Sequence, residues 1–395
     1  MATNKEQNKL NVPHLRFPEF HGEWEKCKLG DIATLTKGSG ISKDQRSATG
    51  TPCILYGELY TTYKSEVINY VVSKTDISDK NLVRSCANDI IIPSSGETAI
   101  DISTARCVLS PDVLLGGDLN IIRLKDGDGR FFSYQLNGVR KHDIAKIAQG
   151  VSVVHLYGES IKGLTVSFPS NKEQQKISTL LSLIDERIAT QSKLIEDLKK
   201  LKSAIIEKLY SEIQGKEYSY RQLFEIINER NNRLEFSNVL SASQERGMVS
   251  REDLNLDIKF ERSNINTYKI VRSGDYVIHL RSFQGGFAFS DIVGVCSPAY
   301  TIMRPKDLLE YGYLSYYFTS RQFIKSLVIV TYGIRDGRSI NVDEWFDMKI
   351  VIPTKEQQRH IVRTIKVFEN KIENEEIYAS CLLKQKQHLL RQMFI

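Results

Sequence analysis

The sequence predicts a mixed α/β (α+β) fold, in which two similar domains are separated by two long helices. Three observations lead to this prediction: a duplicated strand–proline–helix junction, strand-like runs in each half, and two long segments with heptad periodicity. The junction reads PSNKEQQKI at residues 169–177 and PTKEQQRHI at residues 353–361. Because the same junction returns almost half a chain length later, we interpret the chain as an internal duplication of one unit.

Strand-like runs dominate residues 13–168, where apolar or β-branched stretches alternate with Gly, Asp and Ser turns. Residues 131–149 instead predict two short helices, separated at Asn137 and Gly138. This half of the chain is therefore predicted to be a mixed α/β domain. The strand-like runs are residues 53–56, 89–92, 119–124 and 164–168.

Residues 218–352 repeat this pattern. The segment NDIII at 88–92 matches GDYVI at 274–278, and LGDI at 29–32 is matched to LFEI at 223–226 as the start of a short helix. The second half is therefore predicted to be a second copy of the same domain.

Two segments, 171–214 and 354–395, carry apolar residues at three- and four-residue steps and contain almost no helix-breaking residues. This periodicity is typical of a coiled-coil seam. About 40 residues at ~1.5 Å each give helices of roughly 60 Å. Two such helices from duplicated halves would form an antiparallel coiled coil about a pseudo-twofold axis. The residues predicted for a subunit interface are Ile177, Ile184, Ile188, Leu198, Ile205, Ile365, Phe368, Ile372, Leu382 and Leu389.

These patterns divide the chain into five segments. Residues 1–12 are expected to be a flexible leader, and the two domains are expected to be followed each by its long helix. The predicted boundaries are 1–12 for the leader, 13–170 for the first domain, 171–214 for the first helix, 215–353 for the second domain and 354–395 for the second helix.

Composition excludes several classes of protein. Apolar residues make up 41% and charged residues 26%, as in globular proteins, and no apolar run is long enough to span a bilayer. The polar N-terminus lacks the apolar stretch of a secretory signal, so a cytoplasmic location is expected. The six cysteines include no C-x-x-C element, so no metal site is expected. A net charge of +6 permits nucleic-acid binding without requiring it.

Catalytic motifs are not found. The segment 158–165 has the spacing of a phosphate-binding loop but places Leu164 where the lysine is needed, and KGSG at 37–40 lacks the third glycine of a dinucleotide fingerprint. No G-x-S-x-G motif and no Asn-Pro-Pro-aromatic motif of an adenine methyltransferase occurs. His279, in a strand-like run, is interpreted as a packed histidine and not as a base. We therefore predict that the chain is not an enzyme.

Polar and basic residues in Gly-containing loops are better candidates, and they recur at equivalent places in both halves. Arg and Gln side chains have the donor geometry that reads guanine and adenine edges. For any single residue, a solvated turn is the alternative interpretation. The predicted DNA-binding residues are Lys37, Ser39, Lys43, Arg46, Ser94, Ser95, Thr98, Ser152, His155, Arg281, Ser282, Gln284, Tyr332, Arg335, Arg338 and Ser339.

The opening of the chain resembles that of a known family. LRFPEF at 15–20, followed by Trp24 and KLGDI at 28–32, is similar to the start of specificity (S) subunits of type I restriction-modification systems, and the two proline junctions resemble the conserved regions of that family. The resemblance extends over residues 13–395, although the second half has no copy of LRFPEF.

This resemblance implies a function. Each domain would be a target-recognition domain that reads one half of a bipartite sequence in double-stranded DNA. The helices would set the spacer and dock two methylation (M) subunits, which flip an adenine and methylate it. Restriction (R) motor-nuclease subunits would complete the complex. The chain itself would hold no cofactor, since S-adenosylmethionine, ATP and Mg²⁺ belong to the partner subunits, and it would not contact a membrane.

Two alternatives come from other classes of protein. Long heptad helices also occur in coiled-coil scaffolding proteins, whose two globular domains would bind ligands without DNA specificity. The chain could also be a restriction endonuclease that acts alone. Salt-sensitive, sequence-dependent DNA binding would exclude the scaffold, and cleavage by the pure chain with Mg²⁺ would favour the endonuclease.

Overall fold

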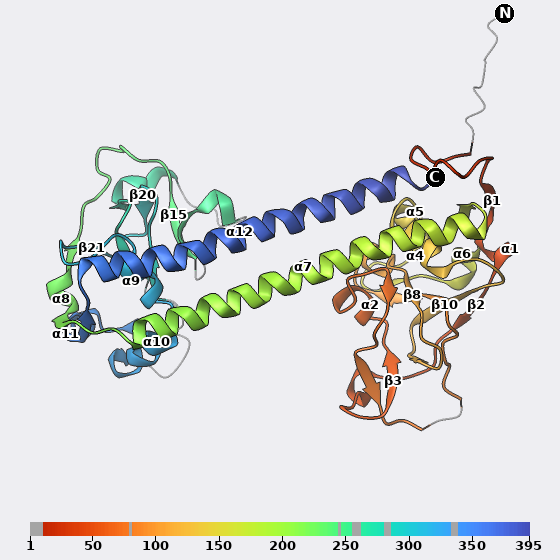
Figure 1. Cartoon of the computed structure of the whole chain (residues 1–395), viewed down its shortest axis with the longest axis horizontal. Coiled ribbons are helices and arrows are strands. Elements are labelled where there is room, and N and C mark those ends of the chain that lie inside the picture. The colour runs from red at the N-terminus through yellow and green to blue at the C-terminus, as the bar shows by residue number, and fades with distance from the viewer. Residues whose placement is uncertain (1–10, 79–80, 244–245, 255–261, 280–285, 333–338) are drawn as a thin grey trace, which may run out of the picture. The chain divides into compact units, whose positions relative to one another are not determined.

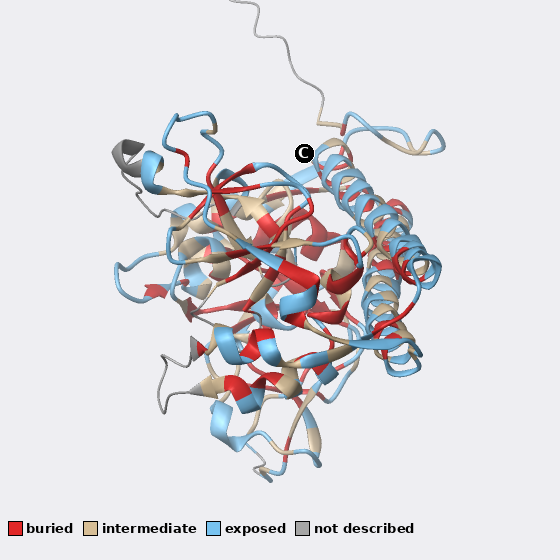
Figure 2. Ribbon diagram, turned by 90° about the vertical axis from the view of Figure 1, so that its left-hand side faces the viewer, coloured by how far each residue is buried: buried red, intermediate tan, exposed pale blue. Residues whose placement is uncertain are grey.

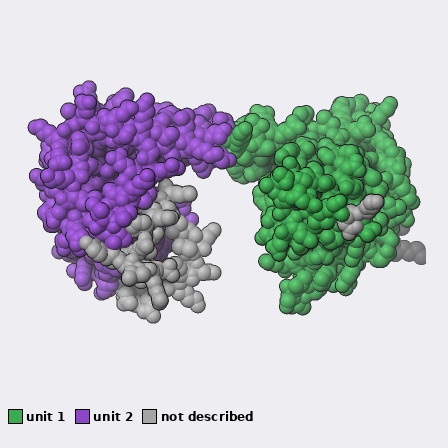
Figure 3. All heavy atoms as spheres, turned by 90° about the horizontal axis from the view of Figure 1, so that it is seen from below, with its two compact units in different colours: residues 1–193, 377–395 green, residues 194–376 purple. Residues whose placement is uncertain are grey.

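The computed structural model describes all of the chain except residues 1–10, 79–80, 244–245, 255–261, 280–285 and 333–338. It divides into two compact units, which we describe separately. Unit 1 comprises residues 1–193 and 377–395, and unit 2 comprises residues 194–376 (Figure 3). Each unit is mixed α/β, as predicted.

Unit 1 is built on a five-stranded sheet with the order β2-β10-β6-β8-β4. A three-stranded sheet, β5-β3-β9, and two two-stranded pairs, β1-β12 and β7-β11, complete its strands. The strands are β1 (Glu25–Lys28), β2 (Ala33–Lys37), β3 (Thr51–Ile54), β4 (Val67–Ile68), β5 (Ser73–Thr75), β6 (Asp89–Pro93), β7 (Ser95–Gly96), β8 (Arg106–Val108), β9 (Leu114–Leu115), β10 (Leu119–Leu124), β11 (Val154–His155) and β12 (Thr165–Phe168). The helices are α1 (Leu29–Ile32), η1 (Lys43–Gln45), α2 (Glu58–Thr61), α3 (Ala99–Ile102), α4 (Gly129–Asn137), α5 (Lys141–Ile147) and α6 (Gly158–Lys162).

Strand β6 shows why this sequence forms a central strand. All five of its residues are buried, and successive side chains point to opposite faces of the sheet. Ile90 and Ile92 belong to the core that contains α4, whereas Ile91 belongs to a separate core on the other face. A continuous apolar run is what a strand covered on both faces requires.

Unit 2 repeats part of this arrangement around a four-stranded sheet with the order β14-β21-β18-β19. The segment 223–226, predicted to begin a helix, instead ends α8 and forms most of β14, so that prediction was wrong. The strands are β13 (Lys216–Ser219), β14 (Phe224–Ile227), β15 (Leu240–Ser243), β16 (Gly247–Ser250), β17 (Lys269–Val271), β18 (Tyr276–Ile278), β19 (Phe287–Phe289), β20 (Gly294–Cys296), β21 (Thr301–Pro305), β22 (Thr331–Tyr332), β23 (Ser339–Ile340) and β24 (Lys349–Ile352). The helices are α8 (Tyr220–Leu223), η2 (Arg251–Leu254), η3 (Arg262–Thr267), α9 (Tyr313–Tyr317), α10 (Arg321–Ser326), η4 (Leu327–Val330) and α11 (Val342–Asp347).

The internal repeat is visible in the strand pairing. β1 pairs with β12 as β13 pairs with β24, and β10 lies between β2 and β6 as β21 lies between β14 and β18. The repeat extends to one ion pair in each unit, between a buried carboxylate and a partly exposed arginine. Asp89, 1% exposed, accepts two hydrogen bonds from Arg123 at 2.8 and 2.7 Å. Asp275, also 1% exposed, accepts two from Arg304 at 2.9 Å.

Two long helices, α7 (Asn171–Ser211) and α12 (Lys355–Gln392), contribute to both units (Figure 1). In unit 1, Ile177 near the start of α7 and Leu390 near the end of α12 belong to one apolar core. In unit 2, Tyr210 at the end of α7 and Ile361 near the start of α12 share the main core. Other faces of both helices remain largely exposed (pale blue in Figure 2).

Candidate nucleic-acid interface

A basic loop follows β2 in unit 1. Lys37 at the end of β2 and Lys43 in η1 are both exposed. Between them, Gly38 passes so close to residue 116 that a Cβ atom would lie 2.0 Å from the Gly116 carbonyl oxygen, so only glycine fits this crossing. The hydroxyl of Ser39 accepts a hydrogen bond from the Val83 backbone N–H at 2.8 Å, which assigns this side chain a structural role.

Arg46, just after η1, is oriented by a buried acid. Its guanidinium lies 3.6 Å from the carboxylate of Glu58, which is 6% exposed. Glu58 also accepts hydrogen bonds from the Leu55 backbone N–H at 2.9 Å and from the Ser73 hydroxyl. Since the Arg46 side chain itself is 40% exposed, its outer N–H groups remain accessible to an anion such as a phosphate.

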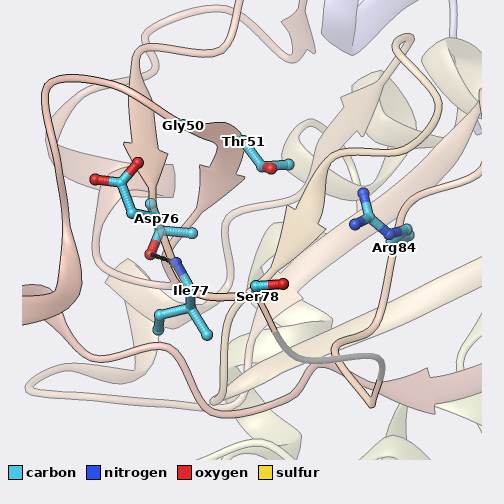
Figure 4. Close-up of a pocket in the computed structure, with 7 residues that line it drawn as sticks. Gly50, Thr51, Asp76, Ile77, Ser78 and Arg84 are labelled. Carbon is cyan, nitrogen blue, oxygen red and sulfur yellow. Dashed lines mark hydrogen bonds between the residues drawn. The ribbon is translucent and has the colours of Figure 1, made fainter.

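A hollow with a volume of about 460 Å³ lies beside this loop (Figure 4). Its lining includes the exposed side chain of Arg84, which donates a hydrogen bond to the Asp112 carbonyl oxygen at 3.0 Å. Ile77 lies across the hollow from Arg84, and its backbone N–H donates a hydrogen bond to the Thr75 hydroxyl at 3.3 Å. Sequence reasoning missed this hollow, although all of its described lining residues except Arg84 fall within residues 40–80. Its described lining residues are Gly50, Thr51, Thr75, Asp76, Ile77, Ser78 and Arg84.

The predicted loop at residues 94–98 is only partly at the surface. Ser94 and Ser95 are 6% and 7% exposed, so these two side chains are buried and the prediction that they contact DNA is not consistent with this structure. Thr98 is exposed, but its hydroxyl caps α3 by accepting a hydrogen bond from the Asp101 backbone N–H at 3.2 Å.

Two predicted residues of the neighbouring loop are exposed. Ser152 lies before β11, and His155, within β11, stacks on Tyr157 with ring centroids 6.2 Å apart. β11 pairs with β7 through Val154 and His155, which fixes the loop to the strand that follows β6. An imidazole and a phenol ring at the surface can each donate hydrogen bonds to DNA.

Most of the candidate residues of unit 2 lie outside the described residues. Tyr332 and Ser339 pair across the short ribbon of β22 and β23. Between them, Arg335 and Arg338 lie outside the described residues. Arg281, Ser282 and Gln284 likewise lie outside the described residues.

Four of the ten predicted interface residues of the helices are buried inside the chain. Ile177, Ile365, Ile372 and Leu382 are 7% exposed or less, so they are core residues and not a surface for another subunit. The prediction of a subunit interface was wrong for these four, because periodicity shows an apolar seam but not its partner. The other predicted residues are half-buried: Ile184, Ile188, Leu198, Ile205, Phe368 and Leu389.

Neither a metal site nor a membrane span is found in the described residues. In the described ranges, no group of three or more His, Cys, Asp or Glu side chains could hold a metal ion. All six cysteines are free. Within the part of the chain that the structure covers, no helix is long and apolar enough to cross a membrane.

Comparisons with known proteins show which family the chain resembles. A family model described as the type I restriction modification DNA specificity domain matches residues 21–200. The type I restriction enzyme MjaVIII specificity subunit of Methanocaldococcus jannaschii is 23% identical over 94% of this chain and 92% of its own. The MjaX specificity subunit of the same organism is 23% identical over 93% and 91%. The chain is similar to type I restriction-modification specificity subunits over nearly its whole length.

Solved structures share the fold of this chain. The S subunit from M. genitalium covers 97% of the chain and 99% of its own, with a TM-score of 0.57 and 16% identity. A chain from a structural study of the assembly and conformational transition of the type I restriction-modification system covers 94% and 97%, with a TM-score of 0.60 and 14% identity.

These similarities support two predictions from the sequence, namely that the chain has the role of a DNA specificity subunit and that it is not an enzyme. None of the comparisons supports the alternative of a coiled-coil scaffold without DNA specificity.

Proposed function

We propose that this specificity subunit reads a bipartite sequence in double-stranded DNA, with one half-site read by each of two target-recognition domains. Residues 13–170 form the first domain in this proposal, and residues 215–353 form the second. The proposal is supported by the repeated strand pairing and by the repeated Asp–Arg ion pairs, which indicate two copies of one reader. Such a complex would act on DNA in the cytoplasm.

The long helices would act as the separator. In this proposal they pair as an antiparallel coiled coil, with residues 171–214 against residues 354–395. Two side-chain contacts support the pairing: Lys202 of α7 lies 3.4 Å from Glu369 of α12, and Arg187 of α7 lies over the ring of Tyr378 of α12, 5.3 Å from its centroid. A rigid pair of helices would hold two half-sites at one spacing.

The exposed basic residues of unit 1 would contact the first half-site. Lys37, Lys43 and Arg46 carry three positive charges on one loop, and Arg84 adds a fourth at the adjacent hollow. Phosphate contacts hold a protein on any DNA, whereas base contacts choose the sequence. The modest net charge of +6 fits a subunit whose partners supply part of the DNA-binding surface.

The chemistry would come from partners. Two M subunits would methylate adenine from S-adenosylmethionine, and R subunits would use ATP and Mg²⁺ to move and cut DNA. The experiment is co-expression of the chain with its M subunit in a methylation-free host, followed by genome-wide mapping of N6-methyladenine. We expect one split motif, present only with both chains. A stable complex that methylates no defined motif would contradict the proposal.

A further inference from the structure

A cluster of buried charges lies in unit 1, away from the basic loop. The ammonium group of Lys386 contacts the Asp185 carboxylate at 2.5 Å and also contacts the Glu66 carboxylate. Asp185 accepts two further hydrogen bonds, from the Tyr134 hydroxyl at 2.8 Å and the Ser65 hydroxyl at 2.9 Å. Lys386, Asp185 and Glu66 are each 9% exposed or less.

The cluster joins four parts of the chain. Glu66 precedes β4, Tyr134 lies on α4, Asp185 on α7 and Lys386 on α12. Lys386 therefore connects the helix that follows the second domain to the first domain and to its helix. Arg106 is also buried near these carboxylates, but its N–H groups donate to the carbonyl oxygens of residues 59, 63 and 105. Lys386 is thus the cation that bridges the two acids.

Unit 2 contains a related but half-exposed arrangement, with one carboxylate and with the roles of the helices exchanged. The Tyr316 hydroxyl, on α9, donates to Glu369 of α12 at 2.7 Å, and Lys202 of α7 lies 3.4 Å from Glu369. Pro169 and Pro353 are 184 residues apart (353 − 169), and the same separation relates two pairs of residues in these clusters. The pairs are Asp185 with Glu369, and Lys202 with Lys386.

The energetic argument concerns specificity and not stability. A buried ion pair must offset the cost of removing both charges from water, and apolar residues of similar volume are often at least as stabilising. A polar residue in an apolar seam is best known as a device that selects one helix register, because other registers leave the charge unpaired. Lys386 interrupts the apolar periodicity of α12, and its carboxylate partners lie on a different helix and on the first domain.

We propose that these Tyr–carboxylate–Lys clusters are register keys, in which Lys386 and Lys202 act as positioning residues. Each key fixes the axial position of one half's helix against the other half's domain and helix. Together they set the spacer between the two half-sites. This inference rests on the proposed function, since it assumes that each unit reads one half-site.

The test neutralises the unit 1 key with near-isosteric changes, Glu66→Gln, Asp185→Asn and Lys386→Met together, and maps N6-methyladenine in cells that express the full chain with its M subunit. We expect a second spacer length in about a tenth of methylated sites, which corresponds to a remaining preference of about 1.4 kcal/mol for the native register. The new spacer should differ by about three base pairs, because a slip of one heptad moves a helix by about 10 Å and one base pair spans ~3.4 Å.

The matched control is Glu196→Gln with Lys200→Met, which removes an ion pair between two exposed side chains that both lie on α7. This control should keep the single spacer of the wild type. The inference is overturned if the neutralised chain unfolds at the wild-type temperature and still methylates at one unchanged spacer. If the wild-type chain itself yields no split motif, the result contradicts the proposed function and does not test the register key.

A second experiment covers the case in which the neutralised chain does not fold. In the half-exposed unit 2 key, Lys202→Glu and Glu369→Lys each place like charges together, and the double variant restores an opposite pair. We expect each single change to lower methylation at the native spacer by about threefold, the effect of a partly exposed ion pair. The double variant should recover most of it. A double variant no better than either single would overturn the inference.

Discussion

The buried glutamine of the second proline junction, Gln358, allows the clearest test of how this fold is held together. It is 1% exposed, and its side chain makes three hydrogen bonds to the backbone. Its amide N–H₂ group donates to the carbonyl oxygens of Leu308 and Pro353, both at 3.0 Å, and its oxygen accepts from the Glu310 N–H at 2.7 Å. It therefore ties the start of α12 to the loop before α9.

Replacing Gln358 with Met keeps the volume and removes all three bonds. An unsatisfied buried group costs about 1–3 kcal/mol. The carbonyl oxygens of Leu308 and Pro353 should each cost an amount near the lower end of this range, because each has a second lone pair. We therefore expect the unfolding free energy of unit 2 to fall by about 3 kcal/mol in total. With a urea slope of roughly 2 kcal/mol per molar, the midpoint should fall by about 1.5 M.

The assay uses the position of the two tryptophans, Trp24 in unit 1 and Trp345 in unit 2. In a Trp24→Phe background, fluorescence during urea unfolding reports on unit 2 alone. The control is Gln357→Met, because Gln357 is exposed and its side chain accepts only from the Thr354 backbone N–H and hydroxyl, at 3.2 and 3.1 Å. If Gln357→Met lowers the midpoint as much as Gln358→Met, the reasoning from buried hydrogen bonds is refuted.

Two further predictions concern unit 1. Burial raises the pKa of the Cys53 thiol from 9.0 to about 11, whereas Cys86 is exposed. At pH 8 a thiol reagent should therefore modify Cys86 in the folded chain and Cys53 only after unfolding. Peptide mapping of the modified chain measures this difference. The folded state holds the Cys53 proton more tightly than the unfolded state does. The stability that this proton contributes is therefore full below pH 9 and is lost between pH 9 and 11. Cys53→Val should reduce this loss of stability, and an unchanged dependence of stability on pH would contradict the raised pKa of Cys53. Replacing Lys43 and Arg46 with Ala should weaken DNA binding by the assembled complex and lower the slope of log K against log salt by about one for each lost phosphate contact. An equal effect from Lys349→Ala, in β24 of unit 2, would show that the loop has no special role.

The sequence predicted the repeated elements because each has a local cause. The apolar run of β6, the two helices α4 and α5 around Asn137 and Gly138, and the heptads of α7 and α12 all follow from periodicity and turn residues. The order of strands in the sheets did not follow. In the three-stranded sheet β5-β3-β9, the parallel pair of β3 and β9 depends on contacts between residues 61 apart (114 − 53), which no local pattern records.

The glutamine junctions show where sequence matching misleads. Matching the letters EQQ to EQQ pairs Gln174 with Gln357. The structure instead equates Gln174 with Gln358, because each is buried, lies five residues after its proline and donates to that proline's carbonyl oxygen, at 2.8 and 3.0 Å. Distance from a fixed backbone feature, and not identity of letters, decides which side chain points into the core.

The same limit applies to the candidate site. The prediction treated serines and basic residues of Gly-containing loops alike as DNA contacts, yet Ser94 and Ser95 are buried while Lys43 and Arg46 are exposed. A serine is small enough to be buried with its hydroxyl satisfied by the backbone, so its presence in a predicted loop says little about exposure. Long basic side chains keep their charge in water, which makes them the more reliable signal.

The apolar seam of the long helices shows how the structure redirects the search for the methylation subunits. Periodicity identified residues such as Ile365 and Ile372, which the chain already buries within itself. An apolar stripe that satisfies an intramolecular contact cannot also dock a partner without unfolding. What remains accessible on these helices are other apolar side chains, among them Leu183 and Leu201 on α7 and Val367 on α12, which are 58%, 47% and 66% exposed. The docking of M subunits that we propose must therefore be tested at these positions, because substituting the buried seam would report on folding and not on assembly.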